Sequence, residues 1–225
     1  MDLQEKLVRS RRLLKELAQR FEPRNIAVAW TAGKDSTVSL ALWREVLADM
    51  GGRDRVLAVS LDTGFKFPEI VAFRDSLARQ WDLDLRVLRP EAAQIPAVVA
   101  KDKLECCRVL KIEPLKRAVT GLGLEVLITG LRADENPSRQ DLSETEARTS
   151  PDYIQANPIL TWTEMDVWSH TLASGLPYCG LYDQGYRSLG CVPCTVKTAP
   201  GQGERAGRAP EKEERMASLR ALGYF

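Results

Sequence analysis

The stretch NIAVAWTAGKDST, residues 25–37, decides the fold because it joins an apolar run to a loop of small and polar residues. Residues 25–30 have the short, apolar character of a buried strand. Residues 31–33 are small, and apolar residues then recur at helical spacing over 36–50. A strand that passes through a tight loop into a helix is the first half of a βαβ unit.

The same alternation of strand and helix continues along the chain. Apolar runs predict further strands, and amphipathic spacing predicts further helices: strands at 55–61, 83–88 and 124–128, and helices at 1–20, 68–80 and 114–120. Nearly unbroken apolar strands are typical of a parallel sheet that helices cover on both faces. We therefore predict an α/β fold with a Rossmann-like (HUP-type) parallel sheet. After residue 130 we expect a mostly helical and loop-rich C-terminal part, with one helix at 163–172.

Length and composition limit the class of protein. The 225 residues are 44% hydrophobic and 28% charged, which suffices for one ordinary core. Because 32 basic residues face 31 acidic ones, a net charge of +1 predicts no broad electrostatic surface for nucleic acid. We find neither an apolar run long enough for a membrane span nor a signal-peptide core. The sequence thus predicts a cytoplasmic protein that does not bind a membrane.

The loop after the first strand has the composition of an anion site. Small residues let the backbone approach an anion, and the helix N-terminus supplies unpaired N–H groups. Lys34 adds a positive charge, Ser36 and Thr37 add hydroxyl donors, and Asp35 suits either Mg²⁺ or a helix cap. The loop is not a Walker A sequence. The alternative, a plain strand–turn–helix joint, gives Lys34 no role beside the positive end of the helix.

The cysteines predict metal or redox chemistry, because the chain has five of them and no export signal. Cys106 and Cys107 are adjacent, whereas Cys191 and Cys194 form a CxxC pair. Adjacent thiolates suit different irons of a cluster better than one tetrahedral zinc ion. Zinc, a redox dithiol and buried apolar cysteines remain alternatives on the residues alone. The single His170 removes multi-histidine metal sites from consideration.

Several separated motifs resemble one superfamily. Residues 31–36 resemble the SGGKDS loop of ATP pyrophosphatases, with Thr31 and Ala32 in place of Ser and Gly. Residues 105–117 and 181–195 resemble the two cluster segments of adenylyl-sulfate (APS) reductases. Shorter matches to the same superfamily occur at 61–69, 129–132, 138–139, 157–164 and 203–208. Over residues 25–208, roughly, the chain therefore resembles the PAPS/APS reductase-like superfamily, which includes the ATP pyrophosphatases.

The resemblance implies an adenine nucleotide site and a [4Fe–4S] cluster within residues 1–200. From residue 201 the chain is rich in Gly, Pro and charged residues, so we expect a flexible tail over 201–225. The implied cluster ligands are Cys106, Cys107, Cys191 and Cys194. Together with the loop chemistry, the resemblance predicts a set of catalytic or anion-holding residues: Lys34, Asp35, Ser36, Lys111, Arg205 and Arg208. It also predicts a nucleotide-binding set: Thr31, Ala32, Gly33, Ser36, Thr37, Asp62, Thr63, Gly64, Gly130 and Arg132.

The chain departs from APS reductases in two respects. Those enzymes carry a nucleophilic cysteine in an ECGLH-like ending, whereas this sequence has no cysteine after Cys194. The usual S-sulfo intermediate needs that thiol. The loop also keeps the Lys-Asp-Ser of enzymes that cleave ATP. We therefore expect an ATP pyrophosphatase that uses Mg²⁺ to form AMP and pyrophosphate, activating an acceptor for sulfur transfer, as in DNA phosphorothioation or tRNA thiolation.

This interpretation implies a cysteine desulfurase or another sulfur donor, and a nucleic-acid acceptor reached through partner proteins; the oligomeric state, a homodimer included, stays open. The enzyme alternative is an assimilatory APS or PAPS reductase that releases sulfite, with the attacking thiol at Cys179 or supplied in trans. Burial statistics favour a buried Cys179. A non-enzyme alternative is a cluster-bearing sensor that binds ATP without turnover.

Overall fold

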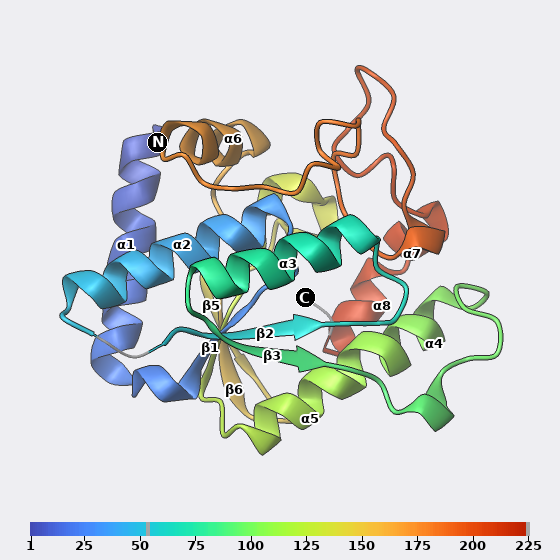
Figure 1. Ribbon diagram of the computed structural model, residues 1–225, viewed down its shortest axis with the longest axis horizontal. Coiled ribbons are helices and arrows are strands. Elements are labelled where there is room, and N and C mark those ends of the chain that lie inside the picture. The colour runs from blue at the N-terminus through green and yellow to red at the C-terminus, as the bar shows by residue number, and fades with distance from the viewer. Residues whose placement is uncertain (53–54, 224–225) are drawn as a thin grey trace.

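A six-stranded sheet runs through the molecule with the strand order β3-β2-β1-β4-β6-β5 (Figure 1). The computed structural model describes residues 1–52 and 55–223. The strands are β1 Ile26–Ala29, β2 Leu57–Leu61, β3 Asp84–Leu88, β4 Val126–Ile128, β5 Thr145–Arg148 and β6 Tyr153–Ala156. All neighbouring pairs are parallel except β5 and β6, which pair antiparallel. The central β1 pairs with both β2 and β4, so the loop that follows it lies at the middle of the sheet edge.

Helices cover both faces of the sheet, as the sequence predicts. The helices are α1 Leu3–Arg20, α2 Lys34–Asp49, α3 Pro68–Gln80, α4 Lys103–Cys107, α5 Glu113–Gly121, α6 Glu164–Ala173, α7 Pro210–Glu213 and α8 Met216–Ala221. Short 3-10 turns occupy Pro23–Asn25, Ala92–Gln94, Ala133–Glu135, Pro137–Arg139 and Val192–Cys194, and a π-helical turn occupies Arg108–Ile112.

The two faces of β1 belong to different parts of the core because side chains alternate along a strand. Ile26 and Val28 pack in the larger cluster, which also contains residues of α1, α2, α3 and α6. Ala27 and Ala29 face the smaller cluster, which contains residues of α5 such as Leu115. A sheet buried on both faces explains why its central strands are almost wholly apolar, and it confirms the predicted α/β class.

The first and the sixth helix begin at capping boxes that the local sequence supplies. At α1, the backbone N–H of Glu5 donates to the Asp2 carboxylate and the backbone N–H of Asp2 donates to Glu5. At α6, Thr163 and Asp166 make the corresponding pair. The ammonium of Lys6 also donates to Asp166 over 2.5 Å, which ties the two helices together.

Two strands lie where the sequence predicts polar loop. The strand β5 lies at the sheet edge and β6 lies between β5 and β4; both are short and carry polar residues, so they lack the apolar signal that reveals the central strands. Buried polar groups near the ends of β4 and β6 bond to one another: Thr129 donates to the Asn157 side-chain oxygen over 2.7 Å, and Gln155 donates to the same oxygen over 3.1 Å. Hydrogen bonding of this kind makes a polar strand compatible with burial.

The segment from residue 201, for which the sequence predicts a flexible tail, forms α7 and α8 in its described part. Met216 and Leu219 are buried with Cys107 and Ile112, so the segment packs on the end of α4 and the turn after it. The domain boundary at residue 200 stays a prediction. Among the described residues, no helix combines the length and the apolar character needed to cross a membrane.

Candidate functional site

The loop between β1 and α2 is held by its own hydroxyl groups. Ala32 has a φ of 63°, in the left-handed region that glycine adopts more easily. The Ser36 hydroxyl accepts from the backbone N–H of Thr31 over 3.2 Å and donates to the Gly33 carbonyl over 3.1 Å. Thr37 donates to that carbonyl over 2.9 Å and accepts from the Trp30 indole over 3.0 Å. The predicted donors Ser36 and Thr37 therefore also shape the loop.

Gly130, at the end of β4, lets a second backbone approach this loop. A Cβ atom there would lie 2.6 Å from the backbone nitrogen of Ser36 and 2.8 Å from the carbonyl carbon of Asp35. Only a residue without a side chain fits at that distance. The first turn of α2 is thus packed directly against the carboxyl end of the neighbouring strand.

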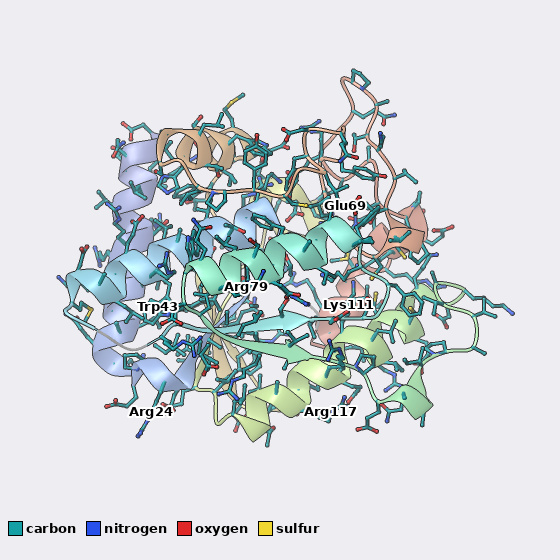
Figure 2. All side chains as sticks on the ribbon, viewed as in Figure 1. Arg24, Trp43, Glu69, Arg79, Lys111 and Arg117 are labelled. Carbon is teal, nitrogen blue, oxygen red and sulfur yellow. The ribbon has the colours of Figure 1, made fainter. Side chains whose placement is uncertain are left out.

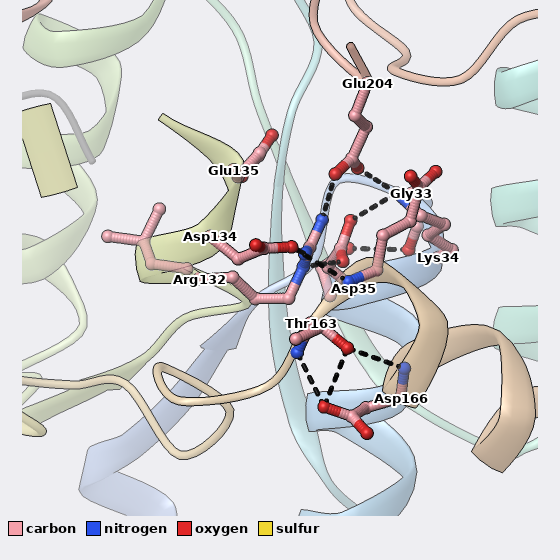
Figure 3. A network of polar contacts seen from close by, with 12 residues as sticks. Gly33, Lys34, Asp35, Arg132, Asp134, Glu135, Thr163, Asp166 and Glu204 are labelled. Atoms are coloured by element: carbon pink, nitrogen blue, oxygen red, sulfur yellow. Dashed lines mark hydrogen bonds and ion pairs between the residues drawn. The ribbon is translucent and has the colours of Figure 1, made fainter. Parts of the chain in front are cut away.

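Five charged side chains meet beside the loop (Figure 3). Lys34 donates to Glu204 and, over 3.1 Å, to Asp35. Arg132 donates to Glu204, to Asp35 over 2.6 Å and to Asp134 over 3.2 Å. Lys34 and Arg132 are 2% and 0% exposed, so water does not screen these contacts.

The protonation of this cluster follows from burial and from its neighbours. Burial lowers the pKa of Lys34, but the carboxylates of Asp35 and Glu204 outweigh it and raise the pKa above its ordinary value. Burial raises the pKa of Glu204, and Asp35 adds to that shift while Lys34 and Arg132 oppose it. Near neutral pH, Lys34 therefore stays charged.

A cavity opens at the carboxyl ends of β1, β2 and β4, where parallel sheets bind ligands. Predicted site residues that line it are Thr31, Gly33, Lys34, Asp35, Ser36, Lys111, Gly130, Arg205 and Arg208. Other predicted site residues are not part of its lining: Ala32, Thr37, Asp62, Thr63, Gly64 and Arg132. Lys111 lies close to the end of β2 (Figure 2), whose last residue, Leu61, lines the same cavity.

The loop that follows β2 makes polar contacts with other parts of the protein. The Asp62 carboxylate accepts from the backbone N–H of Gly64 over 3.1 Å and faces Arg74 at 3.7 Å. The Thr63 hydroxyl lies 3.3 Å from the sulfur of Cys191. Asp62, Thr63 and Gly64 thus support the neighbouring segments, whereas Lys66 of the same loop lines the cavity.

The cavity has a strongly basic wall away from the loop. Arg208 is 7% exposed, and its Nε has no hydrogen-bond partner among the described residues. A Cβ atom on Gly190 would lie 2.3 Å from the Arg208 guanidinium, so glycine makes room for this side chain. Arg205 and Arg139 both donate to Glu135, and Arg205 also donates to Glu213 over 2.6 Å.

The four predicted cluster ligands come from two segments. Cys106 and Cys107 end α4, Cys191 precedes the 3-10 turn Val192–Cys194, and Cys194 ends that turn. All five cysteines of the described chain are free thiols. Burial raises the pKa of Cys106, and the other three thiols of the set add to the shift, so the four lie near enough to interact. Among the described residues, no three His, Cys, Asp or Glu side chains are arranged around a common metal position.

The thiol of Cys191 has the most basic surroundings of these. Burial raises its pKa, but Lys111, the hydrogen bond with Thr63, Lys66 and Lys212 together lower the pKa to about 7. Because Gly190 adjoins it, this thiol lies next to the Arg208 end of the cavity.

Sequence reasoning missed three residues of the site. Tyr182 accepts the backbone N–H of Lys34 over 2.9 Å. Glu204 bonds the two buried cations of the loop, and Glu135 bonds Arg139 and Arg205. Tyr182 and Glu204 lie inside the matched segments 181–195 and 203–208. A sequence motif does not show which residues its side chains contact in the fold, so the sequence held no signal for these contacts.

Comparison with known proteins identifies the family. Residues 25–197 match the model of the phosphoadenosine phosphosulfate reductase domain. This chain belongs to that family. It is 34% identical over 177 residues to the phosphoadenosine 5'-phosphosulfate reductase of Gloeobacter violaceus, covering 74% of this chain and 73% of that protein. It is 35% identical over 185 residues to the adenosine 5'-phosphosulfate reductase of Rhizobium meliloti, covering 76% and 69%.

Solved structures share the fold of this family member. The phosphoadenylyl-sulfate reductase of Candida auris, in a phosphate complex, superposes with a TM-score of 0.69 at 22% identity, covering 83% of this chain and 90% of that one. The FMN adenylyltransferase of Candida glabrata, in complex with FAD and inorganic pyrophosphate, gives 0.72 at 18% identity, covering 98% and 83%. These likenesses confirm the predicted Rossmann-like (HUP-type) architecture.

The comparisons correct one prediction, that of an ATP pyrophosphatase for sulfur transfer. Curated relatives at 31–35% identity are named reductases of phosphoadenosine 5'-phosphosulfate or adenosine 5'-phosphosulfate, which favours the reductase alternative. The prediction gave too much weight to the Lys-Asp-Ser of the loop. In the structure the Lys34 ammonium is bonded to Glu204 and Asp35, a state that its sequence motif does not reveal.

Proposed function

We propose that this protein is a sulfonucleotide reductase, which uses thiols to release sulfite from adenosine 5'-phosphosulfate, leaving AMP, or from its 3'-phosphorylated form, leaving adenosine 3',5'-bisphosphate. The observation that carries the proposal is the buried Arg208 guanidinium, which lines the cavity next to the cysteine segment and whose Nε has no hydrogen-bond partner within residues 1–52 and 55–223. A buried donor of this kind is costly unless an anion accepts from it. The names of the relatives support the same substrate class.

The proposed reaction has two steps, each a thiolate attack on sulfur. A thiolate attacks the sulfur of the phosphosulfate, and the sulfur–oxygen bond to the phosphate breaks. The nucleotide, AMP or adenosine 3',5'-bisphosphate according to the substrate, leaves with both electrons of that bond. A second thiolate then attacks the resulting S-sulfo group, which gives a disulfide and sulfite. Arg208, with Lys111 and Arg205 in the same cavity wall, would bind the anionic end and stabilise the charge on the departing phosphate.

The attacking thiol comes, in this proposal, from outside the 225 residues. Cys179 is 1% exposed, packs in the larger core cluster, and does not belong to the cavity lining. Burial raises the pKa of its thiol, which disfavours the reactive thiolate. A thiol supplied in trans, by a dithiol protein or another chain, needs neither exposure nor activation of Cys179.

The four remaining cysteines fit an iron–sulfur cluster by the chemistry of their donors. They are free thiols from two segments, and the other three raise the pKa of Cys106 in addition to its burial. We include a [4Fe–4S] cluster in the proposal, held by Cys106, Cys107, Cys191 and Cys194. When bound, it would cross-link the end of α4 to the segment that follows Gly190. The Mg²⁺, the cysteine desulfurase and the nucleic-acid acceptor of the ATP-cleaving interpretation have no part in this proposal.

The thiol source is tested by anaerobic turnover of adenosine 5'-phosphosulfate with and without added thioredoxin or small thiols. We expect sulfite only when an external thiol is present, and the same rate for Cys179→Ala as for the unaltered protein. Loss of sulfite in Cys179→Ala, with unchanged folding and iron content, would assign the attacking thiol to Cys179 instead.

The cluster is tested by iron and acid-labile sulfide analysis of protein reconstituted anaerobically. We expect about four irons per chain, as for a [4Fe–4S] centre. Cys191→Ser should lose most of the iron and the brown absorbance, whereas the matched control Cys179→Ser should keep both. Zinc in place of iron, or equal iron in the two variants, would contradict the assignment.

A further inference from the structure

Glu204 neutralises the two cations of the phosphate loop from a distant part of the chain. Its carboxylate accepts hydrogen bonds from Lys34, 170 residues away in sequence, and from Arg132, 72 residues away. Figure 3 shows Glu204 reaching from its own loop between these two side chains. Glu204 is only 9% exposed, so this contact is buried and only weakly screened.

The contacts around Lys34 leave its ammonium little freedom to bind a ligand. Besides Glu204, the ammonium bonds Asp35 over 3.1 Å and approaches the Arg187 carbonyl oxygen at 3.5 Å. Tyr182 adds its ring, 5.5 Å away, and its hydroxyl accepts the backbone N–H of Lys34 over 2.9 Å. One backbone donor of the α2 N-terminus is thus also engaged within the protein.

The positive charges beside the loop are fully offset. Lys34 and Arg132 supply two positive charges, and the buried Asp35 and Glu204 supply two negative ones at hydrogen-bonding distance, to which the more exposed Asp134 adds a third. Loops that bind polyphosphates instead present a lysine to the β and γ phosphates. A diphosphate or triphosphate brought here would meet two carboxylates that oppose its charge at short range.

We propose that Glu204 is a specificity-determining residue, which holds Lys34 and Arg132 so that this end of the cavity accepts a single phosphate group and rejects a polyphosphate chain. The inference rests on the proposed function, because it explains how a loop with the Lys-Asp-Ser of ATP-cleaving enzymes serves a sulfonucleotide. The competing role for Glu204 is a positioning one, in which it keeps Lys34 and Arg132 ready to bind the ligand.

The two roles predict opposite signs for the same measurement. Inorganic pyrophosphate is titrated into the unaltered protein, Glu204→Gln and the control Glu211→Gln, in buffer without divalent metal. Glu211 is exposed in α7, so its substitution removes the same charge from the same segment without touching the loop. We expect Glu204→Gln to bind pyrophosphate at least about tenfold more tightly, since a buried carboxylate that competes with the ligand is gone. The control should bind it as the unaltered protein does.

Unchanged or weaker binding by folded Glu204→Gln would overturn the inference. The weaker result would assign Glu204 the positioning role. Thermal unfolding of each variant without ligand shows whether it is folded, because loss of a buried ion-pair partner destabilises a protein.

A second comparison needs no variant. The unaltered protein should bind AMP at least as tightly as ATP, because the additional phosphates gain nothing at a loop whose positive charges are already offset. ATP binding tenfold or more tighter than AMP would contradict the proposal even if Glu204→Gln failed to fold.

These measurements are independent of the proposed reductase activity. Pyrophosphate, AMP and ATP carry no phosphosulfate, so the binding results stand whether or not sulfite is released. Absence of sulfite with tighter binding by Glu204→Gln would remove the reductase proposal and leave the role of Glu204 intact.

Discussion

The two ends of the cavity differ in what their cations face. At the loop end, Lys34 and Arg132 are bonded to Asp35 and Glu204, which come from the same chain. At the other end, Arg208 lies against Gly190, and its Nε has no partner in the described part of the chain. Both ends contain basic residues. Among the described residues, however, only the end with Arg208 keeps a buried N–H group that is free to donate to an anionic ligand.

The difference teaches that a sequence motif with a lysine or arginine is not by itself a binding site for an anionic ligand. A lysine in a phosphate-type loop binds a ligand only if nothing within the protein has satisfied it first. Burial makes the distinction sharp, because a buried cation must be paired and a paired cation is slow to change partner. Substitutions at the two ends should therefore affect different properties.

Lys34→Ala should give the largest effect, and on stability. It leaves the Glu204 carboxylate buried with Arg132 as its remaining partner, which should lower the free energy of unfolding by about 3 kcal/mol or more. Affinity for adenosine 5'-phosphosulfate should fall by less than about tenfold, since the ammonium is already bonded within the protein.

Denaturant unfolding and ligand titration check both parts of this expectation. The control is Lys15→Ala, an exposed lysine on α1, which should change neither quantity. A stable Lys34→Ala protein that no longer binds the nucleotide would show that the loop end, too, holds the ligand through its lysine.

Arg208→Ala should act on binding. Removing a buried, charge-assisted donor should weaken affinity for adenosine 5'-phosphosulfate about 100-fold, with a smaller loss of stability than Lys34→Ala. Isothermal titration measures the affinity, with exposed Arg215→Ala as the control in the same C-terminal segment. Equal affinity in Arg208→Ala and the control would remove the distinction between the two ends.

Gly130→Ala should disturb the loop end through the backbone. The added methyl group meets the start of α2 at 2.6 Å, so the helix or the strand must shift. We expect a loss of about 2 kcal/mol in the free energy of unfolding, as for other overpacked sites. Gly180→Ala, where the added atom meets nothing within 4 Å, is the matched control. A Gly130→Ala protein as stable as this control would mean that the contact is not tight.

Ala32→Gly should have the smallest effect. Glycine relieves the left-handed backbone at this position but makes the unfolded chain more flexible, so the two contributions oppose each other. We expect a change within about 1 kcal/mol in the free energy of unfolding. A larger gain, measured by denaturant unfolding, would show that the alanine strains the loop.

The central fold could be predicted because its signals are local. The apolar strand β1, the loop after it and the apolar face of α2 each follow from neighbouring residues, and the strands β1 to β4 with the helices α2, α3 and α5 lie close to their predicted positions. The strands β5 and β6 could not be predicted, because a polar strand is defined by its pairing partner and not by its own pattern.

The sequence predicted which types of residue line the site, but not which of them form hydrogen bonds and ion pairs with one another. Lys111, Arg205 and Arg208 line the cavity as the motifs indicate. The role of Lys34 depends on Glu204, and contact between residues so far apart in sequence leaves no periodic or local signal. Burial of Cys179 was expected from its residue type, and the packing confirms it.

Product analysis tests the central claim most directly. Anaerobically reconstituted protein is given adenosine 5'-phosphosulfate with thioredoxin in one reaction, and ATP with Mg²⁺ in another, and sulfite and pyrophosphate are measured in both. The account predicts sulfite and AMP from the first reaction and no pyrophosphate from the second. Pyrophosphate from ATP without sulfite from the sulfonucleotide would contradict it.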